Sequence, residues 1–437
     1  EVIGLISEDK KEFKKVLIRG VPVLGKLENL KDILESSLVK KRVPQRLVIS
    51  TYIMRDLPLA EVIKVAESKG MKVGRSPGPN EILEGKNNES MFKEISLEDL
   101  LGRRQNRLNT KKIQNLINDK VILVTGAGGS IGSELAKSIS QFNPKLLLLL
   151  DSSENAIYEL KQKLFIKKSY NINKYLCSNI RNKKEIEKIF KSYKPEIVFH
   201  AAALKHVTIC EENISEAIRT NSLATLFLAN MSEKYKSKCF VLISTDKAVE
   251  PSSVMGFTKK LAEIIIQSKD LHTKLAARFI SVRFGNVLGS TGSVVPFFKQ
   301  QIKQGGPLTV TDKNVSRFFM TIQEAVDLVM SATFEQLNAE GDRKGSISVL
   351  DMGASVKIDT LAKQMIKMAG FTPGKEIKIK YTGLKKGEKL HEKLFANEEK
   401  KVDKFHKGFF IVNNHILNTN LINKMVERLE VLCKYSN

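Results

Sequence analysis

An aspartate and a lysine stand side by side in the run Ser244-Thr245-Asp246-Lys247-Ala248-Val249, directly after the apolar segment Phe240–Ser244. A carboxylic acid and an amine that share a water-poor pocket can divide acid and base work between them. Neighbouring residues of a regular strand point to opposite faces, so both can enter one pocket only if the strand ends near Thr245, which we assume. The alternative is a solvated ion pair. The downstream Lys259 favours catalysis.

A glycine-rich turn follows another apolar segment, in the run Val121–Leu135. Gly126 would allow a tight turn, Gly129 a close approach of the backbone to a pyrophosphate, and Gly132 the packing of the next helix on a sheet. The helix begins at Ser130 and Ile131, and its free N–H groups and positive dipole end suit phosphates. This spacing after a strand predicts a dinucleotide site.

A carboxylate follows at the distance that such a site needs. Asp151, next to Ser152, ends the second strand about 20 residues on, where it can hold ribose hydroxyls and repel a 2′-phosphate. The cofactor we predict is therefore NAD rather than NADP. The alternative is a packing turn with an incidental aspartate. Two further loops should complete the cleft at the carboxyl ends of the strands: Asn179 and Ile180, then the small residues Ala201, Ala202 and Ala203.

The elements that must position these residues alternate between strands and helices from Val121 onward. Continuous apolar strands separated by helical patterns predict a doubly wound parallel sheet, an α/β fold of the Rossmann type. The strands expected are Val121–Thr125, Leu146–Asp151, Lys174–Cys177, Ile197–His200, Phe240–Ser244 and Phe279–Arg283. A small α/β domain is expected before this sheet.

The domain boundaries expected are these: residues 1–85 for the small domain, 86–120 for a connector, 121–281 with about 318–356 for the cofactor domain, and 282–317 with 357–437 for a substrate-binding part. From Lys357 we expect helices around one short strand, Glu376–Tyr381.

Bulk composition excludes several functions. The formal charge is +24, but the lysines are spread along the chain and mixed with Glu, so we predict no nucleic-acid partner. Four distant cysteines without zinc spacing predict free thiols in a reducing compartment and no metal site. Within the given sequence, no apolar stretch approaches the ~18–20 residues of a membrane helix.

Six motifs together carry a family resemblance. They are TGAGGSIGSEL, FHAAALKHV, LISTDKAV, VMGFTKKLAE, RFGNVLGSTGSVVPFF and SRFFMTIQEA. The chain resembles the large polysaccharide-biosynthesis dehydratases of bacteria, membrane-anchored UDP-N-acetylglucosamine 4,6-dehydratases of the extended short-chain dehydrogenase type, over about residues 1–400. This implies an NAD-dependent reaction: C4 of the sugar is oxidised to a ketone, water is lost across C5 and C6, and C6 is reduced.

The resemblance also implies catalytic roles. Lys247 would be the base at C5 and Asp246 the acid at the C6 hydroxyl, while Thr245 would bind the oxygen at C4 and Lys259 the nicotinamide ribose. Most extended dehydrogenases carry a catalytic tyrosine where this chain has Met255, whose thioether cannot do acid–base work. The large dehydratases also carry methionine there. The acceptor of the C4 hydroxyl proton therefore stays open between Thr245, Lys247 and water.

The substrate implied is UDP-N-acetylglucosamine. Arg317 matches the phosphate-contacting arginine of the family, which suits the bidentate preference of arginine for phosphate. Lys205 and His206 lie within reach of the sugar, although a single histidine is as often structural. The nucleotide loop corresponds to Asn286, Ser293 and Pro296, and the uracil side to Glu388, where the usual Arg-Pro-Gly-Glu is replaced by Lys385-Lys386-Gly-Glu388.

Competing functions stay open. The enzyme alternatives are a 4,6-dehydratase that inverts C5 or a UDP-sugar 4-epimerase, and outside enzymes an NAD-sensing regulator without activity. The resemblance further implies a homo-oligomer at the cytoplasmic face of the bacterial inner membrane, anchored by a segment absent from this sequence.

Overall fold

The structure is a computed structural model in which two units are separable, Glu1–Arg104 and Gln105–Asn437. The residues it describes are 2–7, 16–36, 44–50, 59–76, 93–94, 110–165, 172–338, 343–406, 408–413 and 418–435. Each unit is considered by itself.

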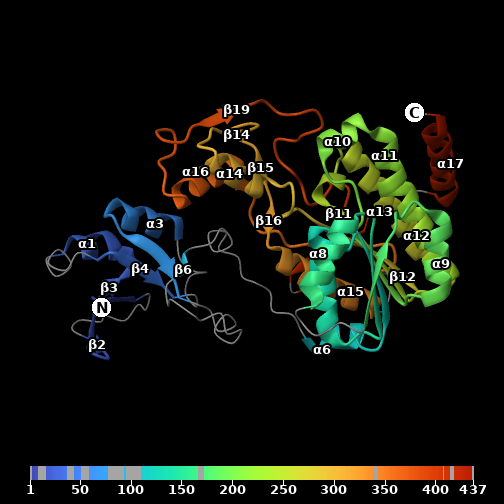
Figure 1. Ribbon diagram of the computed structural model, residues 1–437, viewed down its shortest axis with the longest axis horizontal. Coiled ribbons are helices and arrows are strands. Elements are labelled where there is room, and N and C mark those ends of the chain that lie inside the picture. Colours follow the sequence, from blue (N-terminus) through green and yellow to red (C-terminus); the bar gives the residue numbers. More distant parts are fainter. Residues whose placement is uncertain are drawn as a thin grey trace. The chain divides into compact units, whose positions relative to one another are not determined.

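Within the described residues of the first unit there are two small sheets and two α-helices (Figure 1). Its elements are β1 (Leu5–Ser7), β2 (Leu17–Ile18), β3 (Val21–Lys26), α1 (Leu30–Glu35), β4 (Arg46–Ile49), α3 (Leu59–Ser68), β5 (Lys72–Arg75) and β6 (Lys93–Glu94). Its core forms around Leu30, Ile49 and Val62. The unit is therefore the small α/β unit expected from the sequence, although β6 falls in the predicted connector.

A nine-stranded sheet organises the second unit. In spatial order its strands are β20 (Lys400–His406), β21 (Phe409–Asn413), β17 (Ile347–Leu350), β12 (Arg278–Phe284), β11 (Cys239–Thr245), β10 (Ile197–His200), β7 (Val121–Thr125), β8 (Leu146–Asp151) and β9 (Asn173–Cys177). The seven strands from β17 to β9 are parallel, which confirms the predicted sheet. The chain proceeds outward in opposite directions from β7 and β10, so a crevice for ligands is expected at their carboxyl ends.

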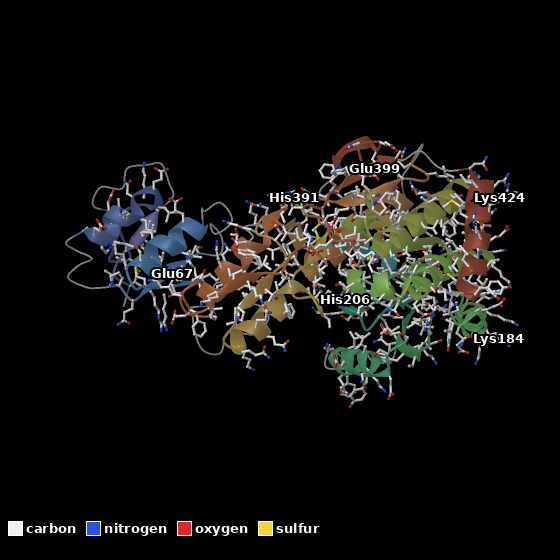
Figure 2. All side chains as sticks on the ribbon, turned by 90° about the horizontal axis from the view of Figure 1, so that it is seen from above. Glu67, Lys184, His206, His391, Glu399 and Lys424 are labelled. Atoms are coloured by element: carbon white, nitrogen blue, oxygen red, sulfur yellow. The ribbon has the colours of Figure 1, made fainter. Side chains whose placement is uncertain are left out.

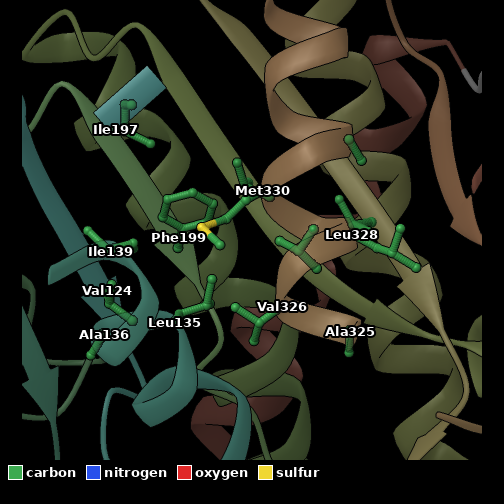
Figure 3. Packing of buried hydrophobic residues seen from close by; sticks show 14 of the residues in the cluster. Val124, Leu135, Ala136, Ile139, Ile197, Phe199, Ala325, Val326, Leu328 and Met330 are labelled. Carbon is green, nitrogen blue, oxygen red and sulfur yellow. The ribbon is translucent and has the colours of Figure 1, made fainter. Parts of the chain in front are cut away.

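Both faces of this sheet are covered by helices (Figure 1). Alternate strand residues face opposite sides: Ile122 and Val124 belong to one core cluster and Leu123 to the other, because side chains alternate along a strand. The first face is covered by α6 (Thr110–Ile117), α7 (Ser130–Ile139), α8 (Glu154–Phe165) and α15 (Ile322–Leu337), and the second by α9 (Lys183–Tyr193), α12 (Ala224–Lys234) and α13 (Val254–His272). Figure 3 shows Phe199 and Met330 in the first of these layers.

The structure differs from the expected organisation at two places. Residues 110–117, which we placed in the connector, form α6, whose Ile113, Leu116 and Ile117 recur on one face of the helix and are buried in the main core. The C-terminal part does more than surround a short strand with helices: β20 and β21 form an antiparallel hairpin that extends the main sheet through β17. Residues 400–406 and 409–413 therefore belong to the main sheet rather than to the predicted substrate-binding part.

The remaining elements lie between or after these strands. They are α10 (Val207–Glu212), α11 (Ile214–Ile218), η4 (Arg219–Leu223), η5 (Asp246–Ala248), β13 (Asn286–Val287), α14 (Val294–Lys303), β14 (Leu308–Val310), β15 (Ser316–Arg317), β16 (Phe319–Met320), β18 (Val356–Lys357), α16 (Ile358–Met368), β19 (Ile379–Tyr381) and α17 (Thr419–Tyr435). Among the helices described, none combines the length and the apolar character needed to cross a membrane.

Candidate active site

The glycine turn after β7 is packed too closely for side chains. Gly126 has a φ of +66°, and a Cβ there would lie 2.6 Å from the backbone nitrogen of Ala202. A Cβ on Gly132 would lie 2.0 Å from the carbonyl oxygen of Gly126. The helix α7 that follows begins without a side-chain cap, because its N-cap is Gly129. Its first N–H groups can therefore bind phosphate oxygens, with Ser130 and Ile131 in the first turn.

Asp151 is the last residue of β8 and faces this turn. Its Oδ2 accepts a hydrogen bond from the backbone N–H of Gly128 (2.9 Å) and its Oδ1 accepts one from that of Ser153 (2.9 Å). These contacts fix the carboxylate beside the turn, the place where a carboxylate can hold ribose hydroxyls. Ser152 is exposed next to it.

The two loops predicted to complete the cleft differ in what they present. Asn179 is exposed and its Oδ1 accepts from the N–H of Arg181 (3.0 Å), whereas the side chain of Ile180 is buried in the core. Only the backbone of Ile180 could therefore contact a ligand. Ala201 and Ala202 lie against Gly126, and Ala203 is exposed.

The segment predicted to be catalytic follows the end of a strand, as the sequence argument assumed. β11 ends at Thr245, and Asp246 and Lys247 occupy the turn of 3₁₀ helix η5. Lys247 Nζ donates to Asp246 Oδ1 (2.9 Å) and to Asn286 Oδ1 (3.0 Å), and Thr245 Oγ1 donates to the same Asp246 Oδ1 (2.9 Å). Acid, base and hydroxyl are thereby brought into one hydrogen-bonded cluster.

Asp246 is fully buried, and its second oxygen, Oδ2, has no hydrogen-bond partner among the residues that the structure describes. A Cβ added to Gly285 would lie 3.0 Å from that oxygen. A bare ionised oxygen in a dry site is costly, whereas a protonated carboxyl needs less solvation. Asp246 Oδ2 therefore lies in a water-poor part of the site.

A buried ionic network lies beneath this segment. Glu263 accepts from Ser244 Oγ (2.7 Å) and pairs with Arg283 (2.9 Å), which also pairs with Glu399 (2.8 Å). These two carboxylates raise the pKa of the Arg283 guanidinium, although burial opposes them. The network connects the end of β11 to the chain just before β20. No pattern in the sequence indicates this network, because its members are far apart in the chain.

Helix α13 carries two of the predicted residues. Met255 is buried and packs with Cys210 and Ala217. Its thioether offers no acid or base to the Asp246–Lys247 pair. Lys259 is 5% exposed, and its Nζ donates to the carbonyl oxygen of Ile243 (2.6 Å). Burial lowers the pKa of Lys259 to about 8.

A pocket of about 250 Å³ opens beside Lys247. Of the residues predicted to bind substrate it brings together His206, Arg317 and Glu388. Sequence reasoning missed other lining residues, among them Ser252, Ser253, Thr311, Lys389 and Glu392. Figure 2 labels two residues near this pocket. His206 lies at the start of α10, and His391 follows Glu388 on the same segment.

Arg317 is 7% exposed, and its Nη2 pairs with Glu388 Oε1 (2.9 Å), which also accepts from Thr311 Oγ1 (3.0 Å). The guanidinium is thus held at the pocket wall by the carboxylate that we had assigned to the uracil side. A fixed, planar donor at this wall can recognise a phosphate.

The loop before α14 connects the pocket with the glycine turn. Thr291 N donates to Ser130 Oγ (3.2 Å), and Lys205 Nζ donates to the carbonyl oxygen of Thr291 (2.5 Å). Burial lowers the pKa of Lys205, and burial together with the Lys205 charge lowers that of His206. Ser293 is the N-cap of α14, Pro296 lies in its first turn, and Ser293 Oγ has no hydrogen-bond partner within the described part of the chain.

One further residue holds the site together and was missed. Asn221, fully buried in the π-helical turn η4, accepts from the N–H of Leu204 (2.8 Å) and donates to its carbonyl (3.0 Å) and to Thr258 Oγ1 (3.0 Å). It therefore fixes the loop after β10 against α13. Single π turns of this kind are frequent near functional sites, but the sequence does not reveal them.

Both the sequence and the structure are similar to those of known proteins. A family model described as "Polysaccharide biosynthesis protein" matches residues 122–414. The chain is 40% identical over 90% of its length to the capsular polysaccharide biosynthesis protein CapD of Staphylococcus aureus, and spans 64% of CapD. It is 35% identical over 64% of its length to a UDP-glucose 4-epimerase of Rickettsia akari, covering 79% of that protein. The structure of Pen from Bacillus thuringiensis superposes with a TM-score of 0.60 at 31% identity, over 69% of this chain and 89% of Pen.

Proposed function

The chain belongs to the polysaccharide biosynthesis protein family of nucleotide-sugar dehydratases and epimerases, and from that premise we propose that it is an NAD-dependent UDP-N-acetylglucosamine 4,6-dehydratase that retains the configuration at C5. The observation that carries the proposal is the 2.9 Å contact between Lys247 Nζ and the buried carboxylate of Asp246. The pair lies beside a pocket lined by Arg317, and a methionine stands where a tyrosine would be needed for simple alcohol oxidation.

The residues around the glycine turn fit NAD. The uncapped start of α7 would bind the pyrophosphate, Asp151 the adenosine ribose, and Lys259 the nicotinamide ribose. Bound there, NAD would accept hydride from C4 and return it to C6. The carboxylate of Asp151 would repel the 2′-phosphate of NADP, which supports NAD as the cofactor.

The proton of the C4 hydroxyl has a route that needs no tyrosine. Thr245 Oγ1 can accept this proton while it passes its own to Asp246 Oδ1, 2.9 Å away. The first step thus leaves Asp246 protonated, which is the state in which it can protonate the departing C6 hydroxyl. The proton lost from C4–OH stays on Thr245, and the threonine's former proton passes through Asp246 into the eliminated water, so the protons balance.

Lys247 then acts at C5. The 4-ketone acidifies the C5 proton, which the neutral amine of Lys247 takes, and the bond between C6 and its oxygen breaks as Asp246 gives up its proton. When C6 has been reduced, the ammonium of Lys247 returns the proton to C5. Because one residue removes and returns it from the same face, the configuration at C5 is retained. Asp246 and Lys247 end the cycle as they began.

The UDP part of the substrate would lie toward Arg317, with the sugar near His206 and Lys205. The product would be a UDP-4-keto-6-deoxy-N-acetylhexosamine for bacterial glycans or glycoproteins. As part of the same proposal we expect a homo-oligomer that works at the cytoplasmic face of the membrane.

A second candidate is a UDP-sugar 4-epimerase, which the 35% identity to the Rickettsia akari enzyme favours. Epimerisation needs an acid–base group at the C4 oxygen but no acid at C6. The buried Asp246 beside Lys247 supports dehydration, and the intact cluster with Lys259 supports an enzyme rather than a regulator.

The test is incubation of the protein with UDP-N-acetylglucosamine and NAD in D₂O, followed by NMR. A 4-keto-6-deoxy product with the gluco configuration at C5 supports the proposal. Inversion at C5 indicates the inverting dehydratase, a galacto product the epimerase, and unchanged substrate a regulator. Lys247→Ala should abolish turnover while NAD binding persists, and retained activity would reassign the base.

A further inference from the structure

A second carboxylate, that of Glu392, lines the same pocket close to Lys247. Glu392 lies 145 residues further along the chain, its side chain is 4% exposed, and its Oε1 is 4.0 Å from Lys247 Nζ. Glu392 Oε2 lies 3.5 Å from Lys389 Nζ and has no hydrogen-bond partner among the described residues. A buried carboxylate this close to the amine of Lys247 is expected to have a function there.

The segment that carries Glu392 is anchored on both sides. Lys389 Nζ donates to the carbonyl oxygen of Val249 (2.7 Å), His391 Nδ1 lies 2.9 Å from Ser316 Oγ, and Lys393 Nζ donates to Glu250 Oε2 (2.8 Å). Two of these contacts are made to residues directly after the catalytic turn. The distance between Glu392 and Lys247 is therefore fixed by the same piece of chain that follows Lys247.

The donors of Lys247 explain how Glu392 can act. An ammonium has three N–H donors and no acceptor. Two of them are directed at Asp246 Oδ1 (2.9 Å) and Asn286 Oδ1 (3.0 Å), while Glu392 Oε1 is beyond hydrogen-bond distance. Glu392 thus acts on the charge of Lys247 through space, and the third donor is left for the substrate.

This inference rests on the proposed function. We propose that Glu392 is a positioning residue whose carboxylate stabilises the ammonium that Lys247 becomes when it takes the proton from C5. Before that step Asp246 holds a proton and is neutral, so Glu392 supplies the negative charge that faces the amine. Lys389 neutralises part of that charge, which lets Lys247 release the proton again in the last step.

The test compares Glu392→Gln, which keeps the shape of the side chain, with Glu398→Gln, an exposed position on the same segment. Each variant is assayed with UDP-N-acetylglucosamine and with the same substrate deuterated at C5. For Glu392→Gln we expect kcat to fall roughly 10- to 100-fold, KM to change less than about twofold, and the C5 deuterium isotope effect to rise. Glu398→Gln should match the unaltered protein in all three.

The outcomes separate this proposal from the function on which it rests. An unaltered protein that makes no 4-keto product overturns both. If the unaltered protein makes the product but Glu392→Gln has an unchanged kcat, only the role of Glu392 is overturned. The same holds if Glu392→Gln raises KM alone, because Glu392 would then be a binding residue. A fall in kcat without a larger isotope effect would reflect a disturbed fold and also contradict the proposal; Glu392→Asp, which keeps the charge, should recover part of the lost rate.

Discussion

Replacing Lys259 by methionine should stabilise the protein at neutral pH while it weakens NAD binding. The ammonium is buried, and burial lowers its pKa from 10.5 to about 8. At 1.36 kcal/mol for each pH unit, holding this charge costs about 3 kcal/mol at pH 7. Methionine removes that cost but leaves the carbonyl of Ile243 without its 2.6 Å hydrogen bond, which costs roughly 1–2 kcal/mol. The net gain expected is about 1–2 kcal/mol.

The pH dependence of this effect has a defined sign. Between about pH 8 and pH 10.5 the unfolded chain keeps the Lys259 proton that the folded chain has lost, so the stability of the unaltered protein rises with pH across this window. Lys259→Met lacks that rise. Its advantage at pH 7 should therefore shrink toward pH 9 and reverse near pH 10.

Urea unfolding at pH 7, 9 and 10, followed by circular dichroism, measures the free energy of unfolding, and a separate titration measures NAD affinity. Lys274→Met, at an exposed position just after α13, is the matched control and should leave both unchanged. The reasoning is refuted if Lys259→Met is destabilised at pH 7 by an amount that does not vary with pH.

Three further outcomes follow from the same geometry. Gly132→Ala should cost on the order of 3 kcal/mol and impair NAD binding in thermal melts and titrations, because its Cβ would lie 2.0 Å from Gly126 O; Gly129→Ala, at 3.2 Å from that oxygen, should cost less. Arg317→Lys should raise KM for the UDP-sugar roughly tenfold with little change in kcat, since lysine cannot bind phosphate as a planar bidentate group; a normal KM would contradict its role. Burial raises the pKa of Asp327 to about 6, so the stability of the folded protein falls as pH rises from 4 to 6. After allowance for solvent screening, Asp327→Asn should raise the free energy of unfolding by roughly 1 kcal/mol at pH 7 and leave it unchanged at pH 3. Denaturation at the two pH values measures this difference.

The sequence by itself predicted six of the nine strands of the main sheet and placed Asp246 and Lys247 directly after one of them. Strands buried on both faces must be continuously apolar, and for this reason Val121–Thr125 and Leu146–Asp151 could be placed to the residue. The glycine turn and Asp151 were recognisable from their spacing after two strands, and Asp246 and Lys247 because the contact between them is local.

The tertiary structure alone decided which distant residues meet. Three residues that contact the turn of Asp246 and Lys247 or the loop beside it lie far from their partners in the chain: Glu392, Asn286 and Asn221. No periodicity or spacing in the sequence predicts these contacts. The same holds for the hairpin β20–β21, because only the pairing of β21 with β17 shows that the hairpin belongs to the main sheet. The local sequence pattern of a segment indicates which secondary structure it can form and which face it must bury. Which other segment it packs against depends on how the whole core packs.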